Sequence, residues 1–270
     1  MPEGHTLHRL ATRFNLRFAG RPTRSTSPQG RFVVEASILD GRVLDEAEAH
    51  GKHLFLTFEE HVVHVHLGLA GKLTFVDRNG DEATVRWRLE TTDHRADLRG
   101  PAACRLLTHG EAETLQERLG PDPLRGDADP QRAWDAIRRS RRSIGALLMD
   151  QQVLSGVGNI YRAEVLYRNR IDPMMEGRLL RRSEWQAIWE DLVTLMRMGV
   201  EYGRIDTVDP EHEPEAMGRP PRIDPHGGEV YVYRRAGEPC LVCATPVRAT
   251  VMADRNLFWC PRCQRRTRRR

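Results

Sequence analysis

The sequence contains very little lysine and no long apolar run. Of its 42 basic side chains, only Lys52 and Lys72 are lysines, and the others are arginines. No stretch approaches the roughly 18 consecutive apolar residues that a membrane-spanning helix needs, and the mean hydropathy is −0.57. No signal-peptide pattern opens the chain. We therefore expect a cytoplasmic protein that has no contact with a membrane.

Cysteine is also scarce, and its spacing excludes the disulfide framework of a small secreted protein. Four of the five cysteines form two C-x-x-C pairs, Cys240 with Cys243 and Cys260 with Cys263. Four thiolates at this spacing match the tetrahedral ligand set of zinc and leave no position for water or substrate. The sequence therefore predicts one structural zinc, in a ribbon whose hairpin turns at residues 253–255, and no catalytic metal.

Charge is plentiful by comparison. The chain has 270 residues, a formal net charge of +4 and a pI of about 9.0. This length suits two domains, and the basic excess permits a polyanionic partner without proving one. Drift toward arginine codons is a sufficient explanation for the lack of lysine. Each retained lysine is still a candidate for a position where its own chemistry is needed.

Short patterned segments fill the first part of the chain. Apolar residues at helical spacing predict a helix over residues 3–14. The segments that follow alternate like half-buried strands and predict a sandwich or barrel, with a hairpin turning at Asn79-Gly80. His64 and His66 alternate on one strand, and we interpret them as ordinary sandwich residues and not as metal ligands. The predicted strands are residues 31–34, 52–58, 61–67, 72–76, 84–89 and 103–107.

The pattern changes at Gly120-Pro121. Residues 129–203 have helical periodicity, whereas residues 206–228 contain five prolines and are predicted to be a linker or a functional loop. A strand-like segment, residues 230–233, leads into the cysteine pairs. The basic residues 266–270 form a tail that can add salt-sensitive affinity for DNA.

Two further motifs are ambiguous when each is taken alone. Gly156-Val157-Gly158-Asn159 interrupts two helical segments. It is either an ordinary tight turn or a place where a phosphate approaches the amino end of a helix. Pro2-Glu3 either starts a helix or, once Met1 is removed, offers a secondary amine that can attack a sugar C1′ while Glu3 acts as the acid.

Together these motifs resemble the formamidopyrimidine-DNA glycosylase / endonuclease VIII family over nearly the whole chain. The resemblance implies an α+β protein with an N-terminal helix and β-sandwich, a helix-two-turn-helix segment and a C-terminal zinc ribbon. It rests, in chain order, on Pro2-Glu3-Gly4, Gly51-Lys52, Leu119-Gly120-Pro121 and residues 148–151, 156–161 and 254–264.

The implied domain organisation divides the chain into five segments. These are a catalytic β-sandwich domain, a helix-two-turn-helix DNA-binding domain, a linker or base-capping loop, the zinc ribbon and the basic tail. In that order they cover residues 1–120, 121–205, 206–228, 229–265 and 266–270.

The resemblance also implies catalytic roles. Pro2 would be the Schiff-base nucleophile and Glu3 the proton donor. Lys52 matches a strand lysine that touches DNA phosphate and assists elimination. Arg255 matches a ribbon arginine that contacts phosphate and is linked to the second elimination.

Three further residues are implied to contact DNA. Asn159 would bind a phosphate, Arg118 would contact DNA beside the domain junction, and Leu69 would be an apolar wedge in the loop of residues 66–71. Gly68 and Ala70 replace the larger side chains that the family places on either side of the wedge. Filling of the gap left by a flipped base is therefore expected to be weaker, or supplied elsewhere.

The implied function is a bifunctional DNA glycosylase and abasic-site lyase of base excision repair. It would act on damaged DNA as a monomer, without a small-molecule cofactor, and would associate with the nucleoid when bound. The Pro-Glu-Gly opening is similar to the endonuclease VIII branch and favours oxidised pyrimidines. His5-Thr6 departs from both branches, so an 8-oxoguanine or formamidopyrimidine glycosylase is a second hypothesis. A zinc-ribbon protein that binds damaged DNA without cutting is a third, which the pairing of Pro2 with Glu3 disfavours.

Overall fold

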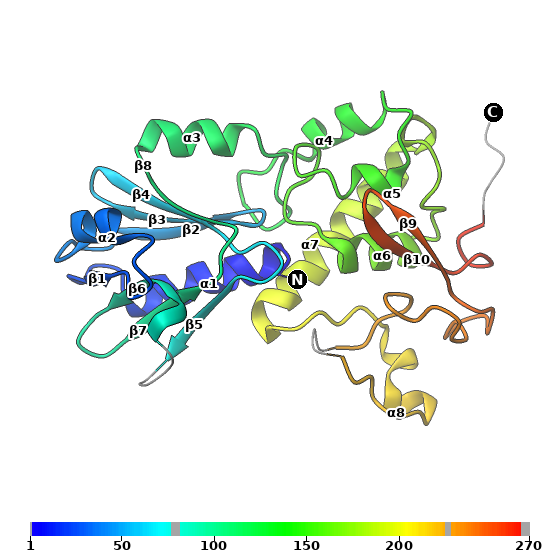
Figure 1. Cartoon of the computed structure of the whole chain (residues 1–270). Coiled ribbons are helices and arrows are strands. Elements are labelled where there is room, and N and C mark those ends of the chain that lie inside the picture. Colours follow the sequence, from blue (N-terminus) through cyan, green and yellow to red (C-terminus); the bar gives the residue numbers. More distant parts are fainter. Residues whose placement is uncertain (1, 77–81, 225–227, 266–270) are drawn as a thin grey trace. The chain divides into compact units, whose positions relative to one another are not determined.

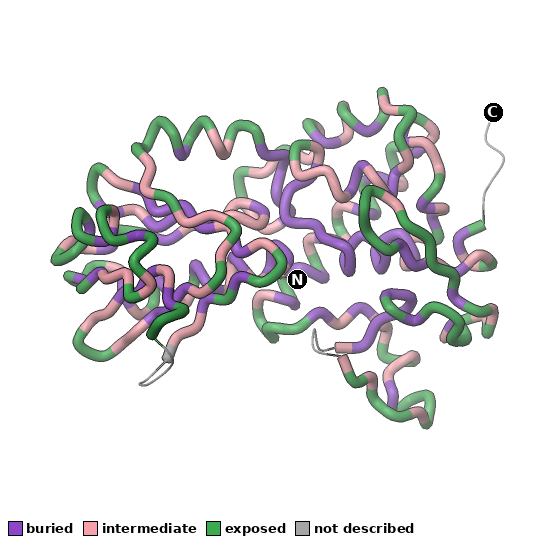
Figure 2. The backbone as a smooth tube through the Cα atoms, viewed as in Figure 1, coloured by how far each residue is buried: buried purple, intermediate pink, exposed green. Residues whose placement is uncertain are grey.

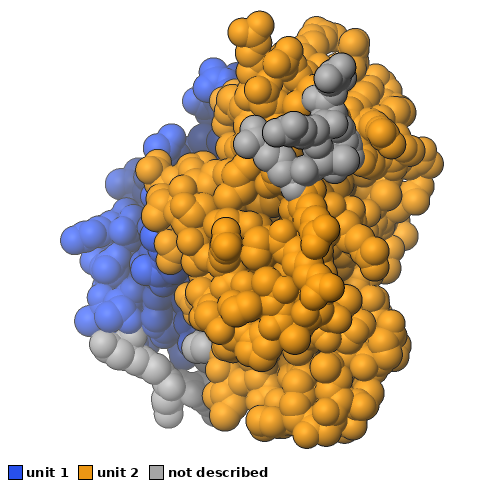
Figure 3. All heavy atoms as spheres, turned by 90° about the vertical axis from the view of Figure 1, so that its right-hand side faces the viewer, with its two compact units in different colours: residues 1–118 blue, residues 119–270 orange. Residues whose placement is uncertain are grey.

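Two units, residues 1–118 and 119–270, make up the computed structural model, which describes residues 2–76, 82–224 and 228–265 (Figure 3). Each unit has a hydrophobic core of its own. Among the described residues, no helix is both long enough and apolar enough to cross a membrane.

Unit 1 begins with the predicted helix. This helix, α1 (Gly4–Arg17), buries Leu7, Leu10 and Phe14 on one face, as their spacing predicts. These side chains join the core of the two sheets that follow, and α1 contacts β2 and β3 directly. The start of the chain is therefore fixed against the sandwich.

Unit 1 is otherwise a sandwich of two antiparallel four-stranded sheets (Figure 1). One sheet has the order β2-β3-β4-β8 and the other β1-β6-β7-β5. Three helical elements accompany them: α2 (Val33–Leu39), the 3-10 turn η1 (Glu82–Thr84) and α3 (His109–Glu117). The strands are β1 (Arg24–Thr26), β2 (Glu46–His50), β3 (His53–Phe58), β4 (His61–His66), β5 (Lys72–Val76), β6 (Val85–Glu90), β7 (Arg95–Arg99) and β8 (Ala103–Leu107).

The sheet β2-β3-β4-β8 is covered on both faces. Leu54 and Leu56 of β3 point into the main core, whereas Phe55 between them packs with Val62 and with Ala112 of α3. Because side chains alternate along a strand, His53 shares the outer face with Phe55. His50, His53, His64 and His66 therefore lie on the outer face, outside the main core.

Two details of the predicted sandwich were wrong. Residues 31–34 do not form a strand, because Phe32, Ala36 and Leu39 are buried at helical spacing and α2 starts at Val33. The strands β5 and β6 do not form a hairpin with each other, since β7 lies between them and pairs with both. The predicted turn at Asn79-Gly80 lies outside the described residues.

A side-chain amide closes the edge of the first sheet. β2 is an edge strand, and its Ala47 exchanges two hydrogen bonds with Asn15 of α1. Asn15 Nδ2 donates to Ala47 O at 2.9 Å, and Ala47 N donates to Asn15 Oδ1 at 2.7 Å. Asn15 thus takes the place of a neighbouring strand and ties α1 to β2.

Unit 2 is helical up to the ribbon. Residues 159–167 of α6 are all buried, so this helix is central to the unit (Figure 2). The longest described helix, α7, buries an apolar stripe that includes Trp185, Ile188 and Leu192. The helical elements are α4 (Pro130–Ile137), α5 (Ile144–Leu147), α6 (Asn159–Arg168), η2 (Gly177–Leu179), α7 (Arg182–Tyr202), η3 (Pro210–His212) and α8 (Pro214–Met217).

Residues 230–233 do not form the predicted strand. The backbone N–H groups of Tyr231, Val232 and Tyr233 donate instead to the buried carboxylate of Glu164, at 2.7, 2.9 and 2.8 Å. Thr207 Oγ1 donates to the same carboxylate at 2.7 Å. The donors that a strand would offer to a neighbour are therefore used by one side chain of α6.

The ribbon is a single antiparallel hairpin of β9 (Arg248–Met252) and β10 (Arg255–Trp259). Its turn is Ala253-Asp254, and both residues have positive φ, of 51° and 56°. Positive φ at both central positions is typical of a tight two-residue hairpin turn. Arg255 is consequently the first residue of β10 and pairs with Met252. The predicted α+β fold of sandwich, helical segment and ribbon is confirmed.

Candidate functional site

Pro2 and Glu3 lie directly before the first turn of α1. Pro2 is half-buried, and Glu3 is only 1% exposed. The carbonyl of Glu3 accepts a hydrogen bond from Thr6 N at 2.9 Å. The helix therefore fixes Glu3 in the position next to Pro2.

Lys52 lies in the two-residue turn between β2 and β3. The turn starts with Gly51, whose φ of +60° is one that glycine adopts without strain. The pair His50 and His53 closes the turn. Since α1 contacts both strands, the same sheet supports the Lys52 turn and the helix that follows Pro2.

The loop of residues 66–71 exposes Leu69, which is 63% accessible to solvent. Gly68 has φ +67°, and a Cβ atom there would lie 2.7 Å from the Cβ of Ala102. A Cβ at Gly71 would lie 2.2 Å from the carbonyl oxygen of Leu67. The small residue at position 68 is therefore required by the loop conformation and by Ala102.

Asn159 is the first residue of α6, and its side chain is bonded at both ends. Its Nδ2 donates to Asn256 O at 2.8 Å, and its Oδ1 accepts a short hydrogen bond from Arg162. The guanidinium of Arg162 also lies 3.3 Å from Met252 O. Asn159 and Arg162 thus join the start of α6 to both strands of the ribbon hairpin, next to Arg255.

Gln151 shapes the glycine turn that precedes α6. Its Nε2 donates to Met149 O at 2.9 Å and to Val157 O at 3.0 Å, and its Oε1 accepts from Gly156 N at 3.0 Å. Gly120 N in turn donates to the carbonyl oxygen of Gln151 at 2.8 Å. One side-chain amide therefore sets the conformation of the turn and the direction in which α6 starts.

The four paired cysteines come together in unit 2, with their sulfur atoms within 4.8 Å of one another. The Sγ–Sγ distance is 3.9 Å between Cys240 and Cys263 and 3.5 Å between Cys243 and Cys260. Sulfur atoms around a tetrahedral zinc lie about 3.8 Å apart, which follows from a Zn–S bond of about 2.3 Å. The donor set and its spacing therefore fit one structural zinc.

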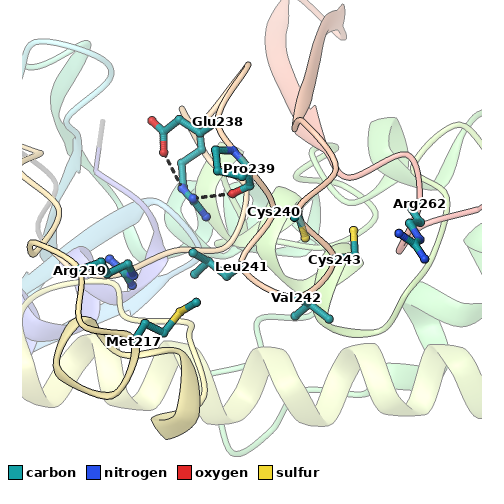
Figure 4. A pocket seen from close by; sticks show the side chains of 11 residues that line it. Met217, Arg219, Glu238, Pro239, Cys240, Leu241, Val242, Cys243 and Arg262 are labelled. Carbon is teal, nitrogen blue, oxygen red and sulfur yellow. Dashed lines mark hydrogen bonds and ion pairs between the residues drawn. The ribbon is translucent and has the colours of Figure 1, made fainter.

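A pocket of about 740 Å³ flanks the first cysteine pair (Figure 4). Two of its arginines are already paired, since Arg235 binds Glu238 at 2.9 Å and Arg219 binds Glu229 at 2.7 Å. None of the predicted catalytic or DNA-contacting residues lines it. Met217 and Arg219, which also line it, belong to residues 206–228, so the pocket lies between that segment and the ribbon.

The predicted site residues are divided between the units. Pro2, Glu3, Lys52, Leu69 and Arg118 lie in unit 1. Asn159, Arg255 and the four cysteines lie in unit 2. Both Arg118, after the end of α3, and Arg255 are exposed.

The sequence analysis missed two charged residues of α6, Arg162 and Glu164, which are both 0% exposed. Arg162 follows Asn159 by three residues, so the two side chains share one face of the helix. That spacing could have indicated a hydrogen bond between the side chains of Asn159 and Arg162. The donors to Glu164 lie 43 to 69 residues further along the chain, and no local pattern predicts them.

Three family profiles cover most of the chain. The formamidopyrimidine-DNA glycosylase N-terminal domain matches residues 1–103, and the H2TH domain of the same enzymes matches residues 119–210. A zinc finger found in these enzymes and in isoleucyl-tRNA synthetase matches residues 237–266. Endonuclease 8 1 of Mycobacterium tuberculosis is 51% identical over 98% of this chain and 100% of its own. This chain belongs to the formamidopyrimidine-DNA glycosylase / endonuclease VIII family.

Other relatives agree with this assignment. The formamidopyrimidine-DNA glycosylase of Methylococcus capsulatus is 30% identical over 84% of each chain. A crystal structure of the Lactococcus lactis enzyme, in complex with a Fapy-dG-containing DNA, has a TM-score of 0.78 and 20% identity, and covers 98% of this chain and 100% of its own. The latter comparison supports the fold.

Membership in this family makes the chain a DNA glycosylase and abasic-site lyase of base excision repair, and so an enzyme that acts on DNA. The zinc-finger match and the clustered sulfur atoms together confirm one structural zinc ion. The chemistry must come from other residues, because all four ligands of that zinc are thiolates.

Proposed function

We propose that this enzyme excises oxidised pyrimidines from damaged DNA, with the amine of Pro2 as the nucleophile. The observation that carries the proposal is the Pro2-Glu3-Gly4 start, in which α1 holds a buried Glu3 next to Pro2. It is supported by the 51% identity to proteins named Endonuclease 8 1.

The proposed reaction uses only groups of the protein and the substrate. After removal of Met1, the Pro2 nitrogen attacks C1′ of the flipped nucleotide, the C1′–base bond breaks, and the base leaves with the proton that the Pro2 nitrogen loses. Glu3 supplies a proton to the ring oxygen O4′, and the C1′–O4′ bond breaks to leave Pro2 joined to C1′ as an iminium. The resulting iminium acidifies the neighbouring C2′ proton. Loss of that proton expels the 3′ phosphate by β-elimination, and a second elimination expels the 5′ phosphate.

The remaining site residues are proposed to hold the DNA backbone. Lys52 would bind phosphate and assist elimination, and the exposed Arg255 would bind phosphate beside the hairpin turn. Asn159 would contribute a phosphate contact through the hydrogen of Nδ2 that Asn256 does not use. Arg118 would be a peripheral contact, and Leu69 would enter the duplex as a wedge.

We also propose the coarser properties that accompany this function. The enzyme acts as a monomer on damaged DNA in the cytoplasm, needs no small-molecule cofactor, and associates with the nucleoid when bound. The chain divides into functional segments at residues 1–120, 121–205, 206–228, 229–265 and 266–270, and residues 206–228 are either a linker or a loop that covers the flipped base.

Borohydride trapping tests the nucleophile. The enzyme, shown by mass spectrometry to lack Met1, is incubated with a duplex that carries one abasic site and then reduced. We expect a covalent adduct at Pro2, and none from Pro2→Gly or from a chain with a blocked amine. DNA binding without any adduct in the zinc-loaded enzyme would overturn the lyase mechanism and favour a non-catalytic binding protein.

A lesion panel tests the substrate. Duplexes with a single thymine glycol, 5-hydroxyuracil or 8-oxoguanine are compared under single-turnover conditions. We expect faster excision of the two pyrimidines. Faster excision of 8-oxoguanine would assign the enzyme to the second hypothesis while leaving the Pro2 mechanism intact.

A further inference from the structure

Three histidines form a row across the sheet next to Lys52. His50 of β2 pairs with His53 of β3, and His53 pairs with His66 of β4. The rings of His53 and His66 have centroids 4.8 Å apart. Since directly opposite residues of adjacent strands share one face, the row lies on the outer face, immediately beside the two-residue turn that carries Lys52.

A fourth histidine lies behind this row and holds it. His64 Nε2 and His53 Nδ1 are 2.8 Å apart, within hydrogen-bond distance. The two rings are stacked at 5.1 Å, and His64 also stacks on Phe55 at 5.3 Å. His64 is only 4% exposed, so the hydrogen bond is shielded from water.

The burial of His64 indicates which ring donates. No group of the described residues forms a hydrogen bond with its Nδ1, which is buried. If His53 donated, the hydrogen of a neutral His64 would lie on that buried Nδ1 without an acceptor. If His64 donates through Nε2, only a lone pair is left unpaired, and buried orphan donors are the rarer case. We therefore assign the hydrogen of the bond to His64, which fixes the hydrogen of His53 on Nε2.

His53, His64 and His66 are uncharged at neutral pH. The pKa of His53 is lowered to about 3, first by burial, because a charged ring would be desolvated, and then by the neighbouring basic groups His64, His66, His50 and Lys52. Burial lowers the pKa of His64 to about 4, with smaller contributions from His66 and Arg105. Burial also lowers the pKa of His66, with a smaller contribution from the charge of Lys52. The charged residues on the elements packed around the row are Glu46 and Glu48 of β2, Lys52, Arg105 of β8, and Glu111, Glu113 and Glu117 of α3.

We propose that His64 and His53 are positioning residues that act through Lys52. His64 fixes the ring and the tautomer of His53, and His53 supports the turn that carries Lys52. The neutral imidazoles of His53 and His66 add no positive charge beside the turn. The inference rests on the proposed function, in which Lys52 contacts the DNA backbone and assists elimination.

Three substitutions separate hydrogen bonding from packing. His64→Phe keeps an aromatic ring for Phe55 and His53 but removes the donor. His64→Gln keeps an N–H close to the position of Nε2. His61→Phe is the control, because His61 lies at the other end of β4, where it pairs with Phe58. The readout is single-turnover cleavage of a preformed abasic-site duplex by zinc-loaded enzyme.

The expected pattern depends on pH. Loss of the donor and of the repulsion from His64 raises the pKa of His53, although burial, the first cause of its low value, still holds it below the ordinary value of about 6.5. A positive charge then appears beside Lys52 as the pH falls. We expect His64→Phe to cleave the abasic-site duplex about threefold more slowly than wild type at pH 8 and about tenfold more slowly at pH 6. His64→Gln and His61→Phe should cleave it within about twofold of the wild-type rate at both pH values. An equal loss at both pH values without rescue by His64→Gln would indicate packing alone and overturn the proposal.

A double-mutant cycle tests whether the effect passes through Lys52. In the Lys52→Ala background, His64→Phe should slow the residual cleavage at pH 6 by less than about twofold. A further tenfold loss would overturn the proposal. If His64→Phe does not fold, His64→Leu replaces it, because it also removes the donor while keeping the imidazole of His53, with the same expected losses and the same cycle. If the wild-type enzyme forms no borohydride adduct, the proposed function is contradicted. If it forms the adduct normally, but the losses of cleavage rate caused by His64→Phe and Lys52→Ala are additive in the double variant, only the role of the histidines is contradicted.

Discussion

The side-chain amide of Asn159 donates to the carbonyl oxygen of Asn256 at 2.8 Å, which joins the first turn of α6 to the strand that begins with Arg255. Arg162 reinforces this link from one helical turn further on. Groups on α6 and on β10 that bind DNA phosphates would therefore be held at a fixed distance from each other.

Replacing Asn159 should weaken this link. Asn159→Ala removes both hydrogen bonds of the amide and leaves the buried Arg162 with one partner fewer. We expect a loss of about 1–3 kcal/mol in the free energy of unfolding, measured with urea, and DNA binding about tenfold weaker. Asn256→Ala is the matched control, because its backbone carbonyl still accepts; an equal loss there would contradict the interpretation.

The carboxylate of Glu164 should be among the most sensitive groups of unit 2. Glu164→Gln keeps the shape of the side chain but turns an N–H group toward backbone N–H donors. We expect the free energy of unfolding to fall by about 3 kcal/mol, measured by chemical denaturation. The exposed Glu190→Gln should change it little, and similar curves for both variants would show that the buried carboxylate is not needed.

Asp97 should determine part of the acid stability of unit 1. Burial raises the pKa of Asp97, but its two arginine partners lower that pKa by more. Arg88 donates two hydrogen bonds to the carboxylate, at 2.7 and 3.0 Å, and Arg99 donates one at 2.8 Å. The net pKa is below its usual value, so its stabilisation is present above about pH 4 and is lost as the pH falls through the folded-state pKa.

The substitution Asp97→Asn tests the direction of this pH dependence of stability. We expect the free energy of unfolding at pH 7 to fall by about 3 kcal/mol, because Arg88 then lacks its buried partner. The difference from wild type should shrink as the pH falls below 4. Asp93→Asn, on the exposed surface of the same unit, should follow the wild-type curve, and a pH-independent difference for Asp97→Asn would contradict the linkage.

Removal of zinc should unfold the ribbon while leaving unit 1 intact. A chelator, or Cys260→Ser, removes the zinc cross-link between the two cysteine pairs, so the hairpin that presents Arg255 should lose its shape. Metal analysis should show one zinc per wild-type chain, and DNA affinity should fall at least about tenfold without it. Cys104→Ser is the control, since burial raises the pKa of this thiol to about 12 and it lies in unit 1; unchanged binding by zinc-free enzyme would exclude the ribbon from DNA recognition.

The zinc ligands and the start of α1 could be predicted because their signals are local. Two C-x-x-C pairs define a ligand set by spacing alone, and the stripe of Leu7, Leu10 and Phe14 defines a helix face. The unusual Gly68 was noticed as a departure from the family. Its reason, the close approach of Ala102, depends on a residue 34 positions away.

The interactions of Glu164 and His53 could not be predicted in this way. Val230–Tyr233 has the composition of a strand, and only the fold brings a carboxylate to its N–H groups. His64 and His66 were interpreted as ordinary sandwich residues because one strand shows only their alternation. Their relation to His53 depends on the register between β3 and β4, which no single segment contains.

Asn15 has a consequence for the protein at high concentration. The strand β2 would otherwise present the N–H and C=O of Ala47 at the rim of its sheet, where a second molecule could add a strand of its own. The amide of Asn15 occupies both groups, so the helix that follows the proposed nucleophile also protects the sheet from self-association. A variant that loses this amide would be prone to aggregate before it loses its chemistry.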